Sequence, residues 1–204
     1  MITMIKLPEQ CFLGTEKPTK EKFRKIENFR SYINKPAGGL WTTDHDGDGE
    51  CDWGDWVKEE EFNEDSYTTP WLVTIKSDAK VLLIDSRKDY YQVKEDYGNG
   101  LPYAYCEYIE IARKVAEEKS ISKDLMKNFE EMTGNALNGI DFEKIAKSYD
   151  VVRLTNKGLK EASFINGSIL AMSTWDVQSC LILNWECIQN IREVDGFHYP
   201  GTSV

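Results

Sequence analysis

The residues best suited to chemistry lie in a twelve-residue segment, 44–55, with the sequence DHDGDGECDWGD. Counted from its start, carboxylates occupy positions 1, 3, 5, 9 and 12, and a glycine occupies position 6. Position 7 is an acidic residue whose backbone carbonyl can coordinate an ion. This is the spacing with which a loop wraps oxygen ligands around Ca²⁺, so we predict a structural calcium site. Its expected ligands are Asp44, Asp46, Asp48, Glu50, Asp52 and Asp55.

Two features separate this segment from an EF-hand. The preceding residues, 34–43, contain one proline and two glycines, which disfavour the helix that enters an EF-hand. The last ligand is Asp55, which is shorter than the usual bidentate glutamate. We therefore expect a calcium loop that leads into a helix over 53–62, and we expect Mg²⁺ to bind less well because it keeps several waters. A solvated acidic turn without a metal is the alternative interpretation.

Aromatic segments form a second group of candidates. Trp41 follows two glycines and precedes the hydroxyls of Thr42 and Thr43. Such a segment lets a ligand approach the backbone while the indole ring stacks on it and the threonines hydrogen-bond. Later in the chain Trp175 directly precedes Asp176. A place in the core is the simpler interpretation for any one tryptophan, but the combination of ring, hydroxyl and acid favours a binding site.

Several common catalytic signatures are missing from the sequence. The chain has only two histidines, His45 and His198, and neither is near a serine or cysteine in a nucleophile elbow. It has no Walker loop and no GxGxxG motif after an expected strand. A serine or cysteine hydrolase, and nucleotide chemistry on the familiar glycine-rich folds, are therefore disfavoured.

The charge of the chain is concentrated in one segment. The 204 residues carry a net charge of −10, and we expect them to form a single domain, 1–204. Residues 44–65, here called the acidic lobe, hold eleven acidic residues and one lysine, so the lobe alone accounts for this charge. A lobe of this kind can attract a basic protein partner, whereas nothing in the charge indicates binding to nucleic acid.

The cysteines and the apolar segments indicate the compartment. The five cysteines are an odd number without CxxC spacing, which argues against a disulfide scaffold and against a zinc site. The first residues lack the apolar run of a signal peptide, and no segment is long and apolar enough to span a membrane. We therefore expect a cytoplasmic protein that does not bind membranes.

Hydrophobic periodicity and capping residues predict an α+β fold. Strands gather near both chain ends and helices lie between them, so we expect a central, mostly antiparallel sheet that is split between the ends. The segments 71–75 and 80–85 form the most obvious hairpin. Expected strands cover 10–15, 38–43, 71–75, 80–85, 149–154, 168–172, 177–184 and 187–192, and expected helices cover 17–32, 53–62, 87–97, 106–119, 122–132 and 141–148, with a polar linker or small helix at 156–165.

The order of these segments resembles that of the ADP-ribosyltransferase superfamily. The residues that carry the resemblance are CFLGT at 11–15, GLWTT at 39–43, DFEKIAKSYDVV at 141–152, and a late strand with an acid. The resemblance implies an ADP-ribosyltransferase-like fold that uses NAD, with Asp176 or Glu186 orienting the nicotinamide ribose. The residues that would contact NAD on this basis are Gly14, Thr15, Trp41, Thr42, Thr43 and Trp175.

Two functions from different classes follow from these observations. The first is an NAD-dependent mono-ADP-ribosyltransferase-like protein with a structural calcium loop and a macromolecular acceptor. The second is a non-catalytic protein from a phage or mobile element, which would bind a basic host partner through the acidic lobe. The pattern KPAGGLWT at 35–42, with WDVQSC at 175–180, is also similar to small bacterial and phage proteins of unknown function.

Overall fold

A computed structural model describes residues 5–28, 35–45, 51–62, 69–98, 113–127, 139–163 and 172–194. Within them, seven strands form one sheet in the order β4-β5-β6-β2-β1-β3-β7. Every neighbouring pair is antiparallel except β4 and β5, so the expected α+β class with a mostly antiparallel sheet is confirmed. The strands are β1 (Gln10–Gly14), β2 (Leu40–Asp44), β3 (Thr69–Ile75), β4 (Val81–Ile84), β5 (Val151–Leu154), β6 (Ser179–Ile182) and β7 (Ile188–Glu193).

The sheet consists of two half-sheets. One contains β4, β5, β6 and β2, and the other contains β1, β3 and β7. In the described part of the chain they are joined only where β1 pairs with β2, through Gln10 opposite Asp44 and Cys11 opposite Thr43. The half-sheets are therefore free to take different directions beyond this short junction.

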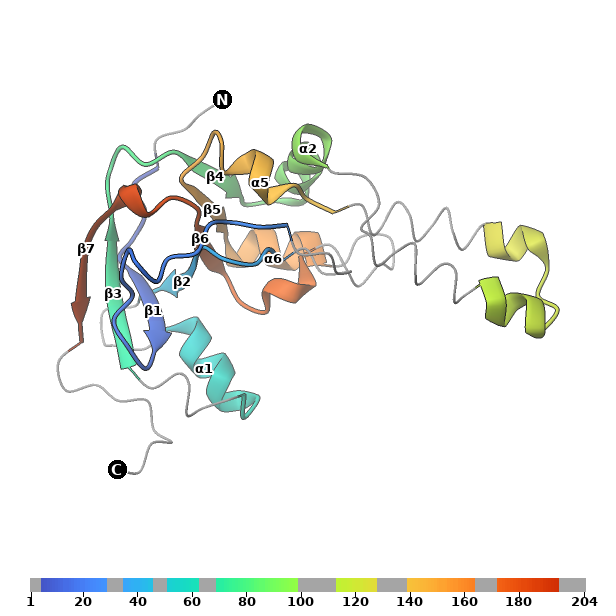
Figure 1. Ribbon diagram of the computed structural model, residues 1–204, viewed down its shortest axis with the longest axis horizontal. Coiled ribbons are helices and arrows are strands. Elements are labelled where there is room, and N and C mark those ends of the chain that lie inside the picture. The colour runs from blue at the N-terminus through green and yellow to red at the C-terminus, as the bar shows by residue number, and fades with distance from the viewer. Residues whose placement is uncertain are drawn as a thin grey trace.

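The sheet curls because a short connection joins distant strands. β3 ends at Ile75 and β4 begins at Val81, although these strands lie five places apart in the sheet. A flat sheet would separate them by about 24 Å, whereas six residue steps span at most about 21 Å. In Figure 1, β3 and β7 accordingly run across the direction of β4. The buried residues of both half-sheets form one apolar cluster, which includes Leu40, Val73, Val81, Val151, Cys180, Ile182 and Ile191.

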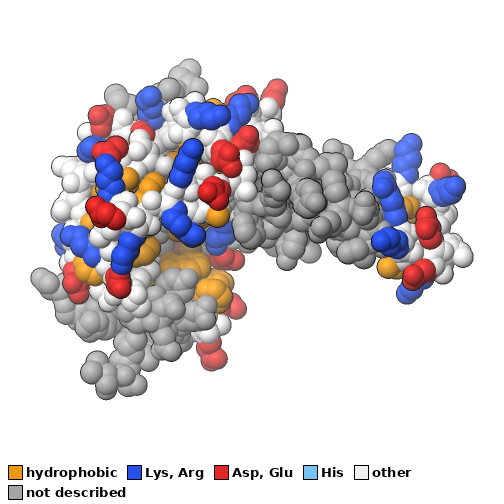
Figure 2. All heavy atoms as spheres, viewed as in Figure 1, with side chains coloured by type: hydrophobic (Ala, Val, Ile, Leu, Met, Phe, Trp, Pro, Cys, Tyr) orange, Lys and Arg blue, Asp and Glu red, His pale blue; other side chains and the backbone are white. Residues whose placement is uncertain are grey.

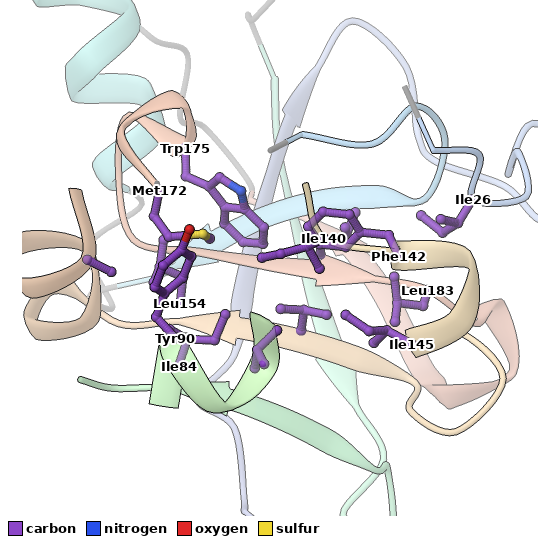
Figure 3. Packing of buried hydrophobic residues seen from close by; sticks show 14 residues of the cluster. Ile26, Ile84, Tyr90, Ile140, Phe142, Ile145, Leu154, Met172, Trp175 and Leu183 are labelled. Carbon is purple, nitrogen blue, oxygen red and sulfur yellow. The ribbon is translucent and has the colours of Figure 1, made fainter. Parts of the chain in front are cut away.

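Helices cover the outer face of the first half-sheet. They are α2 (Arg87–Tyr97), α5 (Phe142–Ile145), α6 (Asn156–Ser163) and the 3₁₀ turn η2 (Ser173–Trp175). Figure 3 shows the buried side chains that fill the space between these elements and the strands, among them Tyr90, Phe142, Met172 and Trp175.

The other helix next to the sheet, α1 (Asp52–Glu59), begins inside the acidic loop at 44–55 and lies against β2 at the junction of the half-sheets. Cys51, directly before α1, packs with Cys11 and Leu13 of β1 and Leu72 of β3. The thiol of Cys51 hydrogen-bonds to Cys11, and this contact together with burial raises the pKa of Cys11 well above its usual value. The helix expected over 53–62 is therefore present, although it starts and ends earlier.

Two short helices at 113–118 and 123–127 lie apart from the sheet in Figure 1. The backbone N–H of Leu125 donates to the Ser122 hydroxyl at 3.2 Å, as expected for a capping residue. No helix in the described ranges combines the length and the apolar character needed to cross a lipid bilayer.

The expected hairpin between 71–75 and 80–85 is wrong. β3 pairs with β1 and β7, whereas β4 pairs in parallel with β5. The residues between them are held by other partners, since Lys76 N–H donates to Cys187 O and Lys80 N–H donates to a carboxylate oxygen of Asp150. A short turn segment therefore connects the two half-sheets instead of closing a hairpin.

The helix expected over 17–32 is wrong in its described part, 17–28, which is a turn and extended chain. Its apolar residues do not share one face, because Phe23 packs into the interior between the half-sheets and Ile26 packs under the helices. Asn28 caps α5, since its side-chain oxygen accepts from Phe142 N–H at 2.8 Å. Contacts with distant residues outweigh the helical spacing of this segment.

Candidate functional site

Trp41 lies on the outer face of β2, at the border between the helices and α1. Alternate residues of a strand point to opposite faces, so Trp41 and Thr43 face outward while Thr42 and Asp44 face the interior. Trp41 is partly buried against the cluster under the helices. Its ring meets that of Trp175 edge to face, with the centroids 4.7 Å apart. The structure thus brings together two of the tryptophans that the sequence analysis selected.

The acid beside Trp175 has a strained backbone. Asp176 has φ 60° and ψ −52°, and the N–H of Val177 donates to Trp175 O at 2.6 Å. This is a γ-turn with positive φ, a rare conformation for any residue other than glycine. Such conformations cost about 1–3 kcal/mol and cluster at functional sites. The turn directly follows Trp175, whose side chain is buried and only 1 % exposed, whereas Asp176 itself is exposed.

A lysine that the sequence analysis did not select completes this group. The ammonium of Lys35 lies 5.1 Å from the ring centroid of Trp41 and 5.6 Å from that of Trp53 on α1. It also lies 3.4 Å from a carboxylate oxygen of Asp176. We call Lys35, Trp41, Trp53, Trp175 and Asp176 the tryptophan site.

Two further features adjoin the tryptophan site. The hydroxyl of Thr174, the residue before Trp175, is buried and has no hydrogen-bond partner. The ring of Trp56 stacks on that of Trp53 at 4.7 Å, which extends the aromatic surface along α1.

The inner face of β2 carries a closed polar network. Arg153 of β5 lies opposite Cys180 of β6, which lies opposite Thr42. The small cysteine lets the arginine reach over β6 to Asp44, which accepts from both terminal nitrogens of its guanidinium. Asp44 also accepts from the Gln10 amide at 2.7 Å, and Gln10 in turn accepts from the Thr42 hydroxyl at 3.2 Å. We call this group the Arg153 network.

Electrostatics in the Arg153 network favour the ion pair. Burial by itself lowers the pKa of Arg153, but its neighbours outweigh burial and raise that pKa. Burial raises the pKa of Cys180 to about 12, so this thiol stays protonated at neutral pH. Asp44 therefore supplies the countercharge of Arg153, and the network has no charge left to offer a ligand.

The structure separates the remaining candidates from the tryptophan site. Gly14 ends β1, where it pairs with Thr69 of β3 and not with β2, and Thr15 is exposed. Thr42 faces the interior. Glu186 is exposed on the 3₁₀ turn η3 (Trp185–Cys187), and its ion pair with Lys20 lowers its pKa.

The described part of the acidic loop consists of its two ends. His45 pairs with Cys51 in an antiparallel bridge, which brings these ends together. Asp52 has a buried carboxylate oxygen without a hydrogen-bond partner, whereas Asp44 is engaged by Arg153. Among the described residues no group of three or more metal-ligating side chains is assembled. Asp46, Asp48 and Glu50 lie outside the described residues.

The comparisons with known proteins add no assignment. No protein-family model matches the chain, and neither a curated protein nor a solved structure is significantly similar to it. The site must therefore be interpreted from its own geometry.

Proposed function

We propose that this chain is an NAD-dependent mono-ADP-ribosyltransferase-like protein whose substrate binds at the tryptophan site. The observation that carries the proposal is Asp176, which lies in a strained γ-turn directly after Trp175 and forms an ion pair with Lys35, whose ammonium lies over the ring of Trp41. A fold maintains strain of this kind only where the surrounding structure enforces it, and such positions cluster at active sites.

The proposed chemistry uses few protein groups. Trp41 would stack on the nicotinamide, and the Asp176 carboxylate would bind a ribose hydroxyl. The bond between C1′ and the nicotinamide nitrogen breaks, and nicotinamide leaves with the electron pair. Asp176 stabilises the positive charge that develops on the ribose. A nucleophile of the acceptor then attacks C1′ and releases its proton to water.

The choice between the two candidate acids follows from their surroundings. Asp176 contacts the ammonium of Lys35, which itself lies over two indole rings. Glu186 is more exposed, with a side-chain exposure of 65 % against 30 % for Asp176, and it forms its ion pair with Lys20 instead. Solvent screens an exposed carboxylate, which weakens its effect on a developing charge. Asp176 is therefore the proposed functional acid, and Glu186 provides a matched control.

The test is incubation with NAD labelled in its adenylate part, with nicotinamide release, label transfer and NAD binding measured together. Asp176→Asn should lower nicotinamide release about 100-fold or more, as expected for the loss of one preorganised electrostatic group. Glu186→Gln should leave the rate unchanged. If the native protein releases no nicotinamide, transfers no label and binds no NAD at millimolar concentration, the proposal fails.

A second candidate function is the binding of a basic partner protein through the acidic lobe. The specific observation is that Phe62 is 40 % exposed next to the exposed acids Glu59, Glu60 and Glu61. Figure 2 shows hydrophobic side chains gathered near α1 with acidic side chains beside them. An apolar centre with a charged rim is the usual composition of a protein interface.

Charge reversal separates this candidate from the enzyme. Changing Glu59, Glu60 and Glu61 to lysine should abolish binding to a purified basic partner and leave NAD turnover unchanged. The control carries Glu117→Lys and Glu118→Lys, two exposed acids on the helix at 113–118. Loss of NAD turnover in the acidic-lobe variant alone would contradict a separate binding surface.

We also propose that the loop at 44–55 binds a structural Ca²⁺. The orphaned buried oxygen of Asp52 supports this, because a buried carboxylate oxygen without a partner is costly unless a cation or a donor meets it. Asp44 would have to give up Arg153 to be a ligand, so we expect the other carboxylates and the Glu50 carbonyl to dominate, at distances of about 2.3–2.6 Å.

Thermal unfolding with Ca²⁺ and with a chelator tests the metal. The melting temperature should rise with Ca²⁺, because an ion that binds only the folded chain stabilises it. Asp46→Ala combined with Asp48→Ala should abolish the rise, and Glu117→Ala with Glu118→Ala should preserve it. An unchanged melting temperature and no calorimetric binding at millimolar Ca²⁺ would leave an acidic turn without a metal.

A further inference from the structure

Lys35 is held by three groups from separate parts of the chain. Its ammonium lies over the rings of Trp41 on β2 and Trp53 on α1, and it forms an ion pair with Asp176 after η2. Its side chain is only 29 % exposed, compared with 61 % for Lys157 in an ion pair of the same length. Two indole faces and a carboxylate around one cation form the arrangement that recognises organic cations.

We infer that Trp41, Trp53 and Asp176 form a receptor for a flat organic cation, and that Lys35 is its built-in occupant, which leaves when the ligand enters. The inference rests in part on the proposed function, because the nicotinamide ring of NAD is a flat cation. The receptor itself, however, depends only on the contacts of Lys35. A flat ring offers each indole more contact area than an ammonium does, so it competes well for the same place.

The backbone beside Lys35 is held by hydrogen bonds. Replacement of the Lys35 ammonium by a ligand therefore requires only the lysine side chain to move. Ala37 pairs with Glu27 in an antiparallel bridge, and Gly39 N–H donates to Arg24 O at 2.8 Å. Gly38 and Gly39 both have positive φ, and a Cβ at Gly38 would lie 2.2 Å from Lys25 O. The flexible lysine side chain, which has four rotatable bonds, can swing toward solvent while this backbone stays in place.

If the ligand replaces the Lys35 ammonium, the lysine and the ligand compete for the same place. A residue that merely braces the site would support ligand binding, and its removal would weaken affinity. An occupant opposes binding, and its removal strengthens affinity for cations in particular. The two roles therefore give opposite signs in one measurement.

The experiment is calorimetric titration of 1-methylnicotinamide chloride, a flat cation methylated on its ring nitrogen, and of neutral nicotinamide. Lys35→Ala should bind the cation about tenfold more tightly than the native chain, the change expected when two cation–π contacts and a partly buried ion pair no longer compete. Lys35→Arg keeps the charge and should bind like the native chain. Lys144→Ala removes a lysine that lies over the ring of Tyr97, and it serves as the matched control.

The increase in cation affinity caused by Lys35→Ala must depend on Trp41 and Asp176. Adding Trp41→Leu or Asp176→Asn to Lys35→Ala should remove the gain for the cation, while neutral nicotinamide should respond little to the loss of Asp176. Circular dichroism checks that each variant is folded. Unchanged or weaker cation binding by folded Lys35→Ala overturns the inference.

The result is separable from the test of the enzyme. Tighter cation binding by Lys35→Ala without any cleavage of NAD would support the receptor and reject the transferase. Cleavage of NAD that slows when Lys35 is replaced would support the transferase and reject Lys35 as a competing occupant.

Discussion

The two faces of β2 carry residues of similar chemistry in opposite situations. On the inner face, Asp44 has both carboxylate oxygens engaged by Arg153 and a further hydrogen bond from Gln10. On the outer face, the Lys35 ammonium lies over Trp41 and forms the single described ion pair of Asp176, at 3.4 Å. The two acids have similar side-chain exposure, 25 % for Asp44 and 30 % for Asp176, so they differ in their partners: a mostly buried guanidinium holds Asp44, and a flexible lysine holds Asp176.

The different partners of Asp44 and Asp176 suggest different roles: Asp44 stabilises the fold, and Asp176 is available for binding. A buried ion pair with complete hydrogen bonding has no capacity left for a ligand, and removing either partner leaves a buried charge. A partly exposed acid in a strained turn contributes little to folding, so folding alone does not explain why the strain is maintained. We therefore expect inner-face substitutions to change stability, and outer-face substitutions to change binding.

The largest effect is expected for Asp44→Asn. The variant leaves the guanidinium of Arg153 buried without its countercharge, which should lower the free energy of unfolding by about 3–5 kcal/mol. Urea denaturation measures the loss. Adding Arg153→Met should recover much of it, because an apolar pair avoids the buried charge.

If Asp44 binds Ca²⁺ and is not the countercharge of Arg153, Asp44→Asn should behave differently. If Asp44→Asn is as stable as the native chain in chelator but no longer responds to Ca²⁺, Asp44 is a metal ligand and not the countercharge of Arg153. The distinction between the two faces of β2 would then be wrong.

The next largest effect is expected at the entrance to β2. Gly39 has φ +67°, and a Cβ there would lie 2.7 Å from Leu181 Cδ1 and 2.8 Å from Ile182 O. Gly39→Ala should therefore destabilise the fold by about 2–3 kcal/mol, measured by urea denaturation. Gly14→Ala is the control, because its Cβ would mainly meet the mobile ring of Phe12. Equal losses would show that the backbone of Gly39 relaxes.

Local signals predicted several elements, although not the chain at 17–28, and they did not predict how the strands pair. The helix expected over 87–97 is confirmed as α2, whose cap Ser86 accepts from Asp89 N–H. The expected cap of α5, Asp141, likewise accepts from Lys144 N–H. Capping depends on residues within one turn, so it can be read from sequence.

Long-range contacts explain what could not be predicted. The pairing of β4 with β5 and the curl of the sheet depend on segments about 70 residues apart, as Val81 opposite Val151 illustrates. The same limit applies to the site, since Lys35 and Trp53 come from segments with no shared motif. The pattern did select Trp41, Trp175 and Asp176, but it could not tell that Thr42 faces the interior.

A paired comparison of Trp41 and its neighbour Thr42 tests the two faces directly. Trp41→Leu should weaken binding of 1-methylnicotinamide about tenfold, because one stacking and cation–π surface is lost. Thr42→Val should leave this affinity unchanged. It should lower the free energy of unfolding by about 1–2 kcal/mol, because the buried Gln10 oxygen loses its donor. Calorimetry and urea denaturation of both variants provide the measurements, and a reversed pattern would contradict the assignment of the faces.

The smallest effect concerns Asp85, an acid on the surface whose hydrogen bond is structural. The Thr155 hydroxyl donates to it at 2.7 Å and lowers its pKa, with a smaller contribution from Lys157. A carboxyl whose pKa is lower in the folded chain stabilises the fold above its unfolded pKa of about 3.9. That contribution disappears as the pH falls through the lower, folded value. Because the Asp85 side chain is 41 % exposed, solvent screening should keep the contribution below about 1 kcal/mol.

The measurement is the difference in unfolding free energy between the native chain and Asp85→Asn as a function of pH. The native chain should be more stable near pH 6, and the difference should shrink as the pH falls below about 4, where the carboxyl becomes protonated in the unfolded chain. Asp78→Asn, which removes another surface acid, is the control. If Asp85→Asn matched the loss expected for Asp44→Asn, the buried guanidinium of Arg153 would not be what makes Asp44 structural, and the contrast between the two faces of β2 would need another cause.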